Sequence, residues 1–415
     1  MRWGRGGPFG CVGYVVSSDF SSLALYRFAG LTVLAVLVLI GAGGLVTSHG
    51  AGMAVPDWPN TYGYNMFFFP ISQWIGGIFY EHTHRLLGAA VGLLTLVLAI
   101  WMQGAPARPW LRRAGWALLG GALTVSLIWP ARWQDAVVLG ATALAALGAS
   151  AFWPRCAPQS AVLRRLGWIA VAMVILQGIL GGLRVTLYKD ELGIVHATLA
   201  QCFLAFMGVI ALMLSPWWRR RETAPAADPE VRSLRGVYAL ATALVLGQLV
   251  LGATMRHEHA GLAVPDFPLA YGRLWPATDP ESIARYNQQR LETRALNDIT
   301  ATHIYVHMAH RLLALGVLGA IGWAWIRTRR CLPRDHAVRR LAGVWLALVG
   351  MQFLLGAWTV WSNKAADVAT LHVVTGAVTF MSGVLLSVTA FAPRVHERVQ
   401  PWGRVSWAAQ AATGV

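Results

Sequence analysis

The chain has 415 residues, of which 56% are hydrophobic and only 13% are charged. A soluble domain of this length does not need so large an apolar fraction to fill its core, so the composition indicates a membrane protein. The formal net charge of +16 could indicate a nucleic-acid partner. The arginines, however, are spread over short loops between apolar runs instead of forming one patch, which argues against nucleic acid.

Ten apolar runs are long enough to cross about 30 Å of hydrocarbon as helices. The first is predicted to be a retained helix, because no convincing signal-peptidase site follows it. The run at 114–130 is the weakest. The fold class predicted is an all-α polytopic membrane protein. In chain order the runs cover residues 28–47, 82–102, 114–130, 135–153, 166–186, 193–214, 237–255, 308–326, 341–361 and 369–391.

Arginines mark every second loop, in groups at 108–113, 155–165, 219–235 and 327–340. By the positive-inside rule these loops are cytoplasmic, and ten crossings place both termini on the same cytoplasmic side. The loop at 48–80 contains no lysine or arginine and is predicted to face outward, as is the long loop at 256–300.

The four cysteines predict no disulfide. Cys11, Cys156 and Cys331 fall in segments assigned to the reducing side of the membrane, and Cys202 falls within an apolar run. An outer loop therefore has no thiol to oxidise.

The sequence contains an internal repeat. Residues 51–63 (AGMAVPDWPNTYG) match residues 260–272 (AGLAVPDFPLAYG) at nine of thirteen positions. The match continues downstream, where EHTHRLLG at 81–88 corresponds to HMAHRLLA at 307–314. Each half is predicted to form an antiparallel four-helix bundle, and the two bundles are parallel repeats related by an axis along the membrane normal.

The runs at 114–130 and 135–153 have no counterpart in the second half, so we expect them to be an inserted, peripheral pair. The predicted divisions are a cytoplasmic N-terminal segment at 1–27, a first bundle at 28–216 with the inserted pair at about 114–153, a cytoplasmic linker at 217–236, a second bundle at 237–392 and a cytoplasmic tail at 393–415.

Four histidines recur in register near the start of helices that run from outside to inside: His84, His196, His310 and His372. An ionisable side chain within a membrane helix is costly and is by default a functional candidate. Two facing imidazoles in one bundle can ligate a haem iron from opposite sides. Any one of them alone could equally be a hydrogen-bonded packing residue. Because the pattern recurs four times, the sequence predicts two haem sites at a similar depth, toward the outer leaflet.

Charged residues beside the histidines distinguish the two halves. Arg85 and Arg311 each follow a candidate ligand, where a guanidinium could pair with a haem propionate or could snorkel to the interface. Glu81 lies three residues before His84, whereas the second half has His307 at that place. A partly buried carboxylate at a haem edge could transfer a proton, although a salt bridge to Arg85 or to an outer-loop arginine is an equal alternative. The hypothesis is that the first half performs chemistry on a bound haem and the second holds a permanent one.

The repeated outer loop contains Pro-Asp-Trp-Pro at 56–59 and Pro-Asp-Phe-Pro at 265–268. Two prolines three residues apart cannot be helical, so each loop is predicted to fold as a lid over its haem. The aspartates, Asp57 and Asp266, are expected to accept backbone N–H groups in an Asx turn rather than to act in catalysis.

These motifs resemble the haem A synthase family. The resemblance is carried by Glu81-His82-Thr83-His84-Arg85, the Pro-Asp-Trp-Pro loop and the histidines that open alternate helices, and it covers about residues 25–392 apart from the inserted pair. It implies an oxidoreductase of the bacterial cytoplasmic membrane that oxidises the C8 methyl of haem O to a formyl group, making haem A for terminal oxidases.

The resemblance also implies roles for the site residues. His84 and His196 would hold the substrate haem, Glu81 would assist its oxidation, and His310 and His372 would ligate a haem b. The partners implied are haem O, haem O synthase and an electron donor, while a homo-oligomer is left open. The chain departs from some family members in lacking a cysteine pair in the first outer loop, which puts thiol-linked chemistry in doubt.

Two other classes of protein compete with this interpretation. A di-haem electron-transfer cytochrome would need haems at both leaflets, and the histidines predict one level only. A secondary transporter would need broken helices near the midplane, and the histidine-bearing runs are continuous.

Overall fold

The computed structural model describes residues 12–187, 189–222, 229–290 and 298–392. Nine helices within these residues are long and apolar enough to cross a membrane, and the regular secondary structure there is helical. This confirms the prediction of an all-α polytopic membrane protein. Cys11 and the predicted tail at 393–415 lie outside the described residues.

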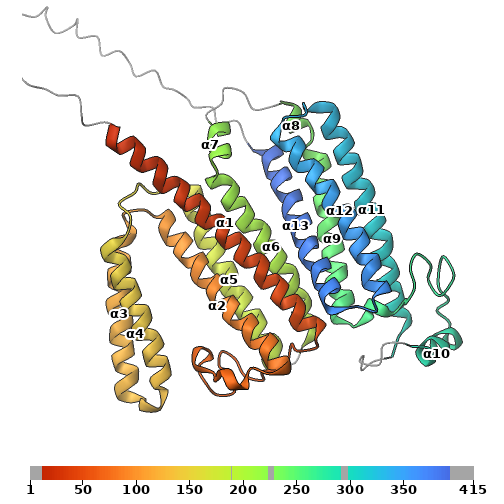
Figure 1. Ribbon diagram of the computed structural model, residues 1–415, viewed down its shortest axis with the longest axis horizontal. Helices are drawn as coiled ribbons and strands as arrows, with labels where there is room; N and C mark the ends of the chain where they lie inside the picture. Colours follow the sequence, from red (N-terminus) through yellow and green to blue (C-terminus); the bar gives the residue numbers. More distant parts are fainter. Residues whose placement is uncertain (1–11, 188, 223–228, 291–297, 393–415) are drawn as a thin grey trace, which may run out of the picture.

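Eight of the helices form two groups of four (Figure 1). The first group is α1 (Val12–Ser48), α2 (Gly76–Met102), α5 (Ala161–Leu187) and α6 (Asp190–Leu214). The second is α9 (Arg235–His257), α11 (Ala301–Cys331), α12 (Ala337–Trp361) and α13 (Ala366–Phe391).

Within each group the helices contact one another in a closed ring. In the first bundle α1 packs on α2 and α6, and both of these pack on α5, so α2 and α6 lie diagonally opposite each other. In the second bundle α9 packs on α11 and α13, and both pack on α12, so α11 and α13 are the diagonal pair. A side chain on the inward face of one diagonal helix can therefore reach across the bundle core toward the other diagonal helix.

The two bundles meet along α13, which packs on α1 and α6, and α6 also packs on α9. Small residues allow close approach there, since a Cβ at Gly208 would lie 2.9 Å from Sδ of Met381 and one at Gly44 would lie 2.9 Å from Cγ2 of Thr370. Such positions are common where membrane helices associate, because lipid supplies no hydrophobic drive for them to do so.

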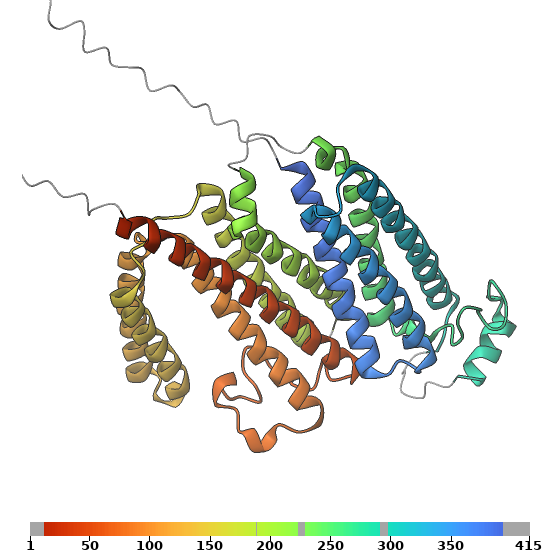
Figure 2. The ribbon, with the colours of Figure 1, turned by 45° about the horizontal axis from the view of Figure 1, so that its top comes forward.

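The inserted helices form a hairpin at the edge of the molecule (Figures 1 and 2). α3 (Ala107–Ile128) and α4 (Trp133–Phe152) pack mainly on each other, joined by the short helix η3 (Pro130–Arg132). The helix expected at 114–130 is present, but α3 is not among the nine apolar spans. Arg108, Arg112 and Arg113 occupy its first turns and reduce its apolar length, so the expectation of ten equivalent apolar crossings is corrected.

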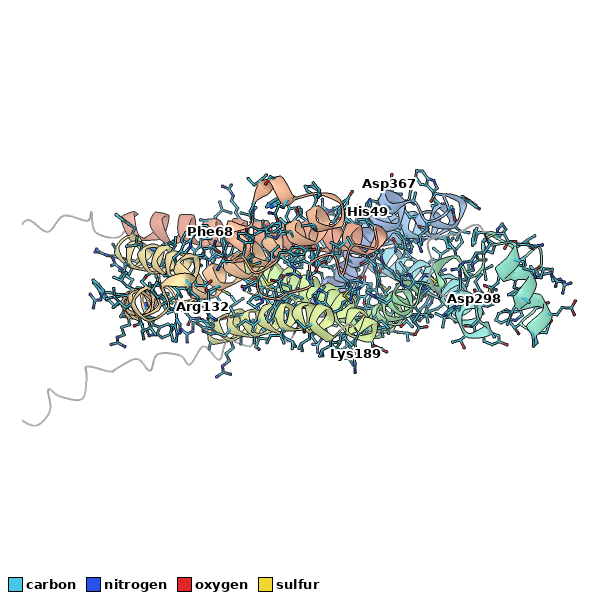
Figure 3. All side chains as sticks on the ribbon, turned by 90° about the horizontal axis from the view of Figure 1, so that it is seen from below. His49, Phe68, Arg132, Lys189, Asp298 and Asp367 are labelled. Carbon is cyan, nitrogen blue, oxygen red and sulfur yellow. The ribbon has the colours of Figure 1, made fainter. Side chains whose placement is uncertain are left out.

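The remaining elements lie in loops at the two ends of the bundles. α7 (Pro216–Glu222) and α8 (Pro229–Ser233) lie on the side where α1 begins and α13 ends (Figure 1). The opposite side, seen in Figure 3, carries the loops that contain His49 and Lys189 and the first turn of α13 with Asp367. Four short elements belong to the outer loops: η1 (Met66–Phe68), η2 (Ile71–Gln73), η4 (Ala260–Leu262) and α10 (Pro280–Gln288).

Candidate functional site: two histidine pairs

The four predicted histidines lie on the diagonal helices of the two bundles, near the ends that carry the outer loops. His84 on α2 and His196 on α6 form one pair, close enough to interact electrostatically. His310 on α11 and His372 on α13 form the other, with the same interaction. The structure therefore brings together the residues that the sequence paired.

Each imidazole packs against a glycine on a neighbouring helix that carries no candidate ligand. A Cβ built on that glycine would lie 3.0 to 3.3 Å from Cε1 of the ring, which is tighter than most real contacts. Only glycine leaves room for the ring at this place. The four contacts are Gly43 of α1 with His84, Gly181 of α5 with His196, Gly252 of α9 with His310, and Gly356 of α12 with His372.

The histidines fit a haem iron better than a bare metal ion. Nδ1 of His84, His196 and His372 is buried and has no hydrogen-bond partner among the described residues, a costly state unless a ligand engages the ring. No group of three or more histidine, cysteine, aspartate or glutamate side chains in the described part could hold a metal ion. A pair of imidazoles is sufficient for haem, because the porphyrin supplies the other four ligands.

Glutamines hold both histidines of the second bundle. Nε2 of Gln248 lies 3.1 and 3.2 Å from the two ring nitrogens of His310 and donates to its backbone carbonyl at 3.0 Å. Nε2 of Gln352 donates to the carbonyl of His372 at 2.9 Å and lies 3.5 Å from its ring Nε2. Partners of this kind orient a metal-binding imidazole.

The first bundle lacks these contacts. Leu39 stands four residues before Gly43, as Gln248 stands before Gly252. Gln177 precedes Gly181 by the same spacing, but its amide forms no hydrogen bond within the described residues. The histidines of the first bundle therefore lack the glutamine side-chain contacts that both histidines of the second bundle have.

The outer loop that carries the Pro-Asp motif, which we call the lid, is anchored to the histidine helix by an arginine. In lid 1, Arg85 donates to the carbonyls of Asp57 at 2.6 Å, Asn60 at 2.9 Å and Val55 at 2.9 Å. Its remaining partner is Oε1 of Glu81, at 2.8 Å. The guanidinium thus lies under the loop, where its donors are used by the protein itself.

Arg311 repeats this arrangement in lid 2. It donates to the carbonyls of Asp266 at 2.6 Å, Leu269 at 2.9 Å and Val264 at 3.1 Å, and its guanidinium lies over the ring of Phe267. Each predicted haem-binding arginine therefore fixes a lid directly beside a candidate ligand.

The lid aspartates hold the turn, as predicted. The carboxylate of Asp57 accepts the N–H groups of Tyr62 at 2.7 Å and Gly63 at 2.8 Å. Asp266 accepts those of Tyr271 and Gly272 at the same distances. Both tyrosines have positive φ angles near 50°, and both peptide bonds between the aromatic residue and the second proline are cis. The expectation that these aspartates accept backbone N–H groups is confirmed, but the N–H groups lie five and six residues along the chain, so each carboxylate closes a wider loop than an Asx turn.

The phenol of Tyr271 also belongs to this network. Burial, with a further contribution from Tyr286, raises the pKa of Tyr271 to about 12. The phenol therefore stays protonated at neutral pH and can donate to the carbonyl of Ala263 at 2.9 Å.

Glu81 is buried between the lid and the helix, with 4% of its surface exposed. Its Oε2 accepts the N–H of Val55 at 2.9 Å, and its Oε1 forms the salt bridge to Arg85. His307, which is 3% exposed, takes this place in the second half. The salt bridge between Glu81 and Arg85, which was the alternative to a role in proton transfer, is therefore present. The Glu81 carboxylate also lies one helical turn from His84.

Two further histidines are buried near the lids. His82 is fully buried, with Nδ1 3.1 Å from Oγ1 of Thr61 and its ring against Phe69 and Trp74, so its role is structural. His257 was expected in an outer loop, but it is the buried last residue of α9.

Reasoning from the sequence missed the glycines that receive the histidine rings. The signal was present as Gln-x-x-x-Gly at 177–181, 248–252 and 352–356, with Leu-x-x-x-Gly at 39–43. All four segments lie on helices without a candidate ligand, so the pattern points to the histidines only once neighbouring helices are known.

The model of a family described as cytochrome oxidase assembly protein matches residues 135–384. A haem A synthase of Sphingopyxis alaskensis is 25% identical over 382 residues, covering 89% of this chain and 91% of that protein. A haem A synthase of Novosphingobium aromaticivorans is 24% identical over 398 residues, covering 87% and 93%. One of Methylobacterium radiotolerans is 26% identical over 394 residues, covering 86% and 89%.

Proposed function

This chain belongs to the family of cytochrome oxidase assembly proteins, and we propose that it is a haem A synthase that oxidises the C8 methyl of haem O to a formyl group. The observation that carries the proposal is the repeated diagonal histidine pair under an arginine-anchored lid. Relatives named haem A synthase align with nearly the whole chain, both bundles included. Both pairs lie at the same end of the bundles, which does not favour a cytochrome that carries electrons across the membrane.

The first bundle is proposed to bind the substrate. His84 and His196 would ligate the iron of haem O, and the absence of a glutamine side-chain hydrogen bond to either ring among the described residues suits a ligand that must enter and leave. Lid 1 would exclude water from the reacting methyl group. Arg85 would contribute to haem binding by fixing this lid, and Arg311 would do the same in lid 2. A direct pairing of either arginine with a propionate stays a prediction.

The second bundle is proposed to hold a permanent haem b, ligated by His310 and His372. Gln248 and Gln352 support this assignment, because fixed imidazoles lower the cost of ordering the ligands when haem binds. A haem b, when bound, would supply electron transfer. The buried His307 leaves this bundle without a carboxylate at the place of Glu81.

Glu81 is proposed to assist the oxidation. Conversion of a methyl group to a formyl group removes four electrons, which an external oxidant such as dioxygen must take up, and protons move to or from the site as it proceeds. A buried carboxylate near the iron ligand can accept, hold or return them. Its contact with Val55 couples the same carboxylate to the position of lid 1. Haem O synthase, an electron donor and further copies of the chain are proposed as partners, in a bacterial membrane with both termini cytoplasmic.

The test is haem extraction from protein purified with and without Glu81→Gln, in cells supplied with haem O. The wild-type protein should yield haem A together with haem b, and the variant should yield mainly haem O and haem b. Glu81→Gln keeps the size and one hydrogen-bond acceptor, so lost product reports lost charge. If the wild-type protein yields only haem b under these conditions, the cytochrome alternative stands and the synthase proposal fails.

A further inference from the structure

The inserted hairpin touches the lid of the first bundle through its outer tip. The backbone N–H of Asn65 donates to Oε1 of Gln134 at 2.9 Å, and its Nδ2 donates to Oδ1 of Asp135 at 2.8 Å. Beside these bonds Phe68 packs edge-on against Trp133, with ring centroids 5.3 Å apart. Figure 3 shows Phe68 and the hairpin tip on the same face.

Asn65 occupies the junction of lid 1. It follows the bridge between Thr61 and Tyr64 that closes the Pro-Asp turn. Its own Oδ1 accepts the N–H of Phe67 and caps η1. That helix leads to Phe69, which is 4% exposed and packs on His82. A contact that holds Asn65 therefore holds both the Pro-Asp turn that precedes it and the helix η1 that follows it.

The opposite end of the hairpin is fixed to the first bundle. Ala105 donates to the carbonyl of Cys156 at 2.9 Å, and Gln159 donates to that of Met102 at 3.0 Å. Between these two ends α3 and α4 make no extensive contact with the helices of either bundle within the described residues. The hairpin thus spans the height of the first bundle and is tied to it mainly at both ends.

Lid 2 is braced in another way. At the position equivalent to Asn65 it has Leu274, whose side chain is 88% exposed. Its support comes from α10 of its own loop, where Tyr286 stacks on Tyr271 with ring centroids 3.5 Å apart. α10 is in turn held by hydrogen bonds between Asn287 and the backbone of Ile299 at 2.7 and 3.0 Å. Each lid therefore has a brace, and only the first depends on the hairpin.

We infer that the α3–α4 hairpin is a strut whose tip residues Gln134 and Asp135 hold lid 1 closed over His84 and His196. The strut thereby sets how fast a tetrapyrrole exchanges with the first bundle. The bond from Asn65 to the carboxylate of Asp135 is charge-assisted, the kind of contact that is strong enough to control a loop. Identification of the exchanging ligand as haem O rests on the proposed function, whereas closure of the lid does not.

The first experiment measures lid opening without haem. In a cysteine-free chain, Val55→Cys places a thiol in lid 1 at a side chain that is fully buried in the closed structure, and its labelling by a membrane-impermeant maleimide is timed. Asn65→Asp sets two carboxylates against each other and should speed labelling by about tenfold, the factor that corresponds to losing one charged hydrogen bond. Combining it with Asp135→Asn restores a donor and an acceptor and should return the rate close to that of the parent. Leu274→Asp, at the equivalent exposed position of lid 2, should leave it unchanged.

The second experiment times haem transfer from the loaded protein to apomyoglobin. Asn65→Asp should speed release from the first bundle and not from the second. Unchanged labelling in Asn65→Asp, or failure of the double variant to restore it, would overturn the strut. Faster labelling with unchanged haem release would instead support the strut and contradict the placement of the exchanging haem under lid 1, which separates this inference from the proposed function.

Discussion

A membrane histidine needs both a partner for its nitrogen and room for its ring, and here the room comes from glycine. Gly181 is the position that faces His196. Gly181→Val should push the ring aside and remove most of the haem from the first bundle, because a Cβ there already lies 3.3 Å from Cε1 and the methyl groups add further volume. Haem content by the pyridine haemochrome assay measures the effect. Gly178→Val is the matched control on the same helix, since a Cβ there meets nothing within 4 Å. If both variants lose the same amount of haem, the space at Gly181 is not what His196 requires.

The histidines themselves give a sharper prediction, because each pair serves one bundle only. His84→Ala or His196→Ala should remove one of two haems and leave the spectrum of the second bundle intact. His310→Ala or His372→Ala should do the converse. Optical and electron paramagnetic resonance spectra of the purified variants distinguish the two low-spin signals. Unchanged pigment in any of the four variants would contradict its assignment as a ligand.

At the scale of residues, the sequence predicted the side chains that can be compared between the two halves of the repeat. It did not predict contacts that side chains make with backbone groups. The four histidines and Glu81 could be singled out because one half can be compared with the other. The contacts of Arg85 could not be predicted, because its partners are the backbone carbonyls of Asp57, Asn60 and Val55. Every residue has a carbonyl, so the residue types do not indicate which ones bind.

At the scale of elements, the lid is a folded unit that depends on one guanidinium. Arg85→Lys replaces a planar fork with a single ammonium that cannot reach three carbonyls and a carboxylate together. Leaving buried acceptors unpaired costs about 1–3 kcal/mol each, so lid 1 should open more often even without haem. The cysteine-labelling assay on haem-free protein measures this. Unchanged labelling combined with weaker haem binding would instead favour the pairing of Arg85 with a propionate.

The brace of lid 2 has a predictable pH dependence. Oδ1 of Asp279 caps α10 by accepting the N–H of Ser282 at 2.9 Å, and this hydrogen bond lowers the pKa of Asp279 below its usual value of 3.8. A carboxylate with a lowered pKa stabilises the fold above its unfolded-state pKa, and the benefit disappears as pH falls through the folded-state value. The protection of α10 against hydrogen exchange, measured relative to the intrinsic rate at each pH, should therefore fall below about pH 4. Asp279→Ala should raise exchange at neutral pH and remove this pH dependence, and a variant that kept the wild-type profile would show that the cap is unimportant.

The elements were largely predictable because long apolar runs leave little choice of structure in a membrane. The departure at α3 has a physical cause, since Arg112 and Arg113 shorten its apolar stretch. The contact between Asn65 and Asp135 could not be foreseen, because 70 residues separate them and the hairpin has no copy in the second half against which to compare it.

At the scale of the whole molecule, the two histidine pairs lie at one level because both bundles are built from the same repeat. The repeat predicts each bundle by itself but not how the two meet. Helix α13 is the element that contacts both α1 and α6, and its apolar sequence does not reveal which of its faces turns toward the first bundle. The interface is therefore the part of the architecture that had to come from the structure.

A partly buried arginine joins the bundles at the level of the sites. Nη2 of Arg256, on α9, donates to the carbonyl of Gly44 at 2.6 Å and to Oγ of Ser48 at 2.7 Å, both on α1. Arg256→Met keeps much of the apolar stem but loses both bonds, and each charged bond contributes about 1.5–3 kcal/mol, so the melting temperature should fall by several degrees. Arg235→Met, at the exposed start of the same helix, removes an equal charge without an interface contact and should melt with the parent. If the two variants melt alike, the bundles are held by their apolar and small-residue contacts alone, and the two histidine pairs owe their relative position to helix packing instead of to this arginine.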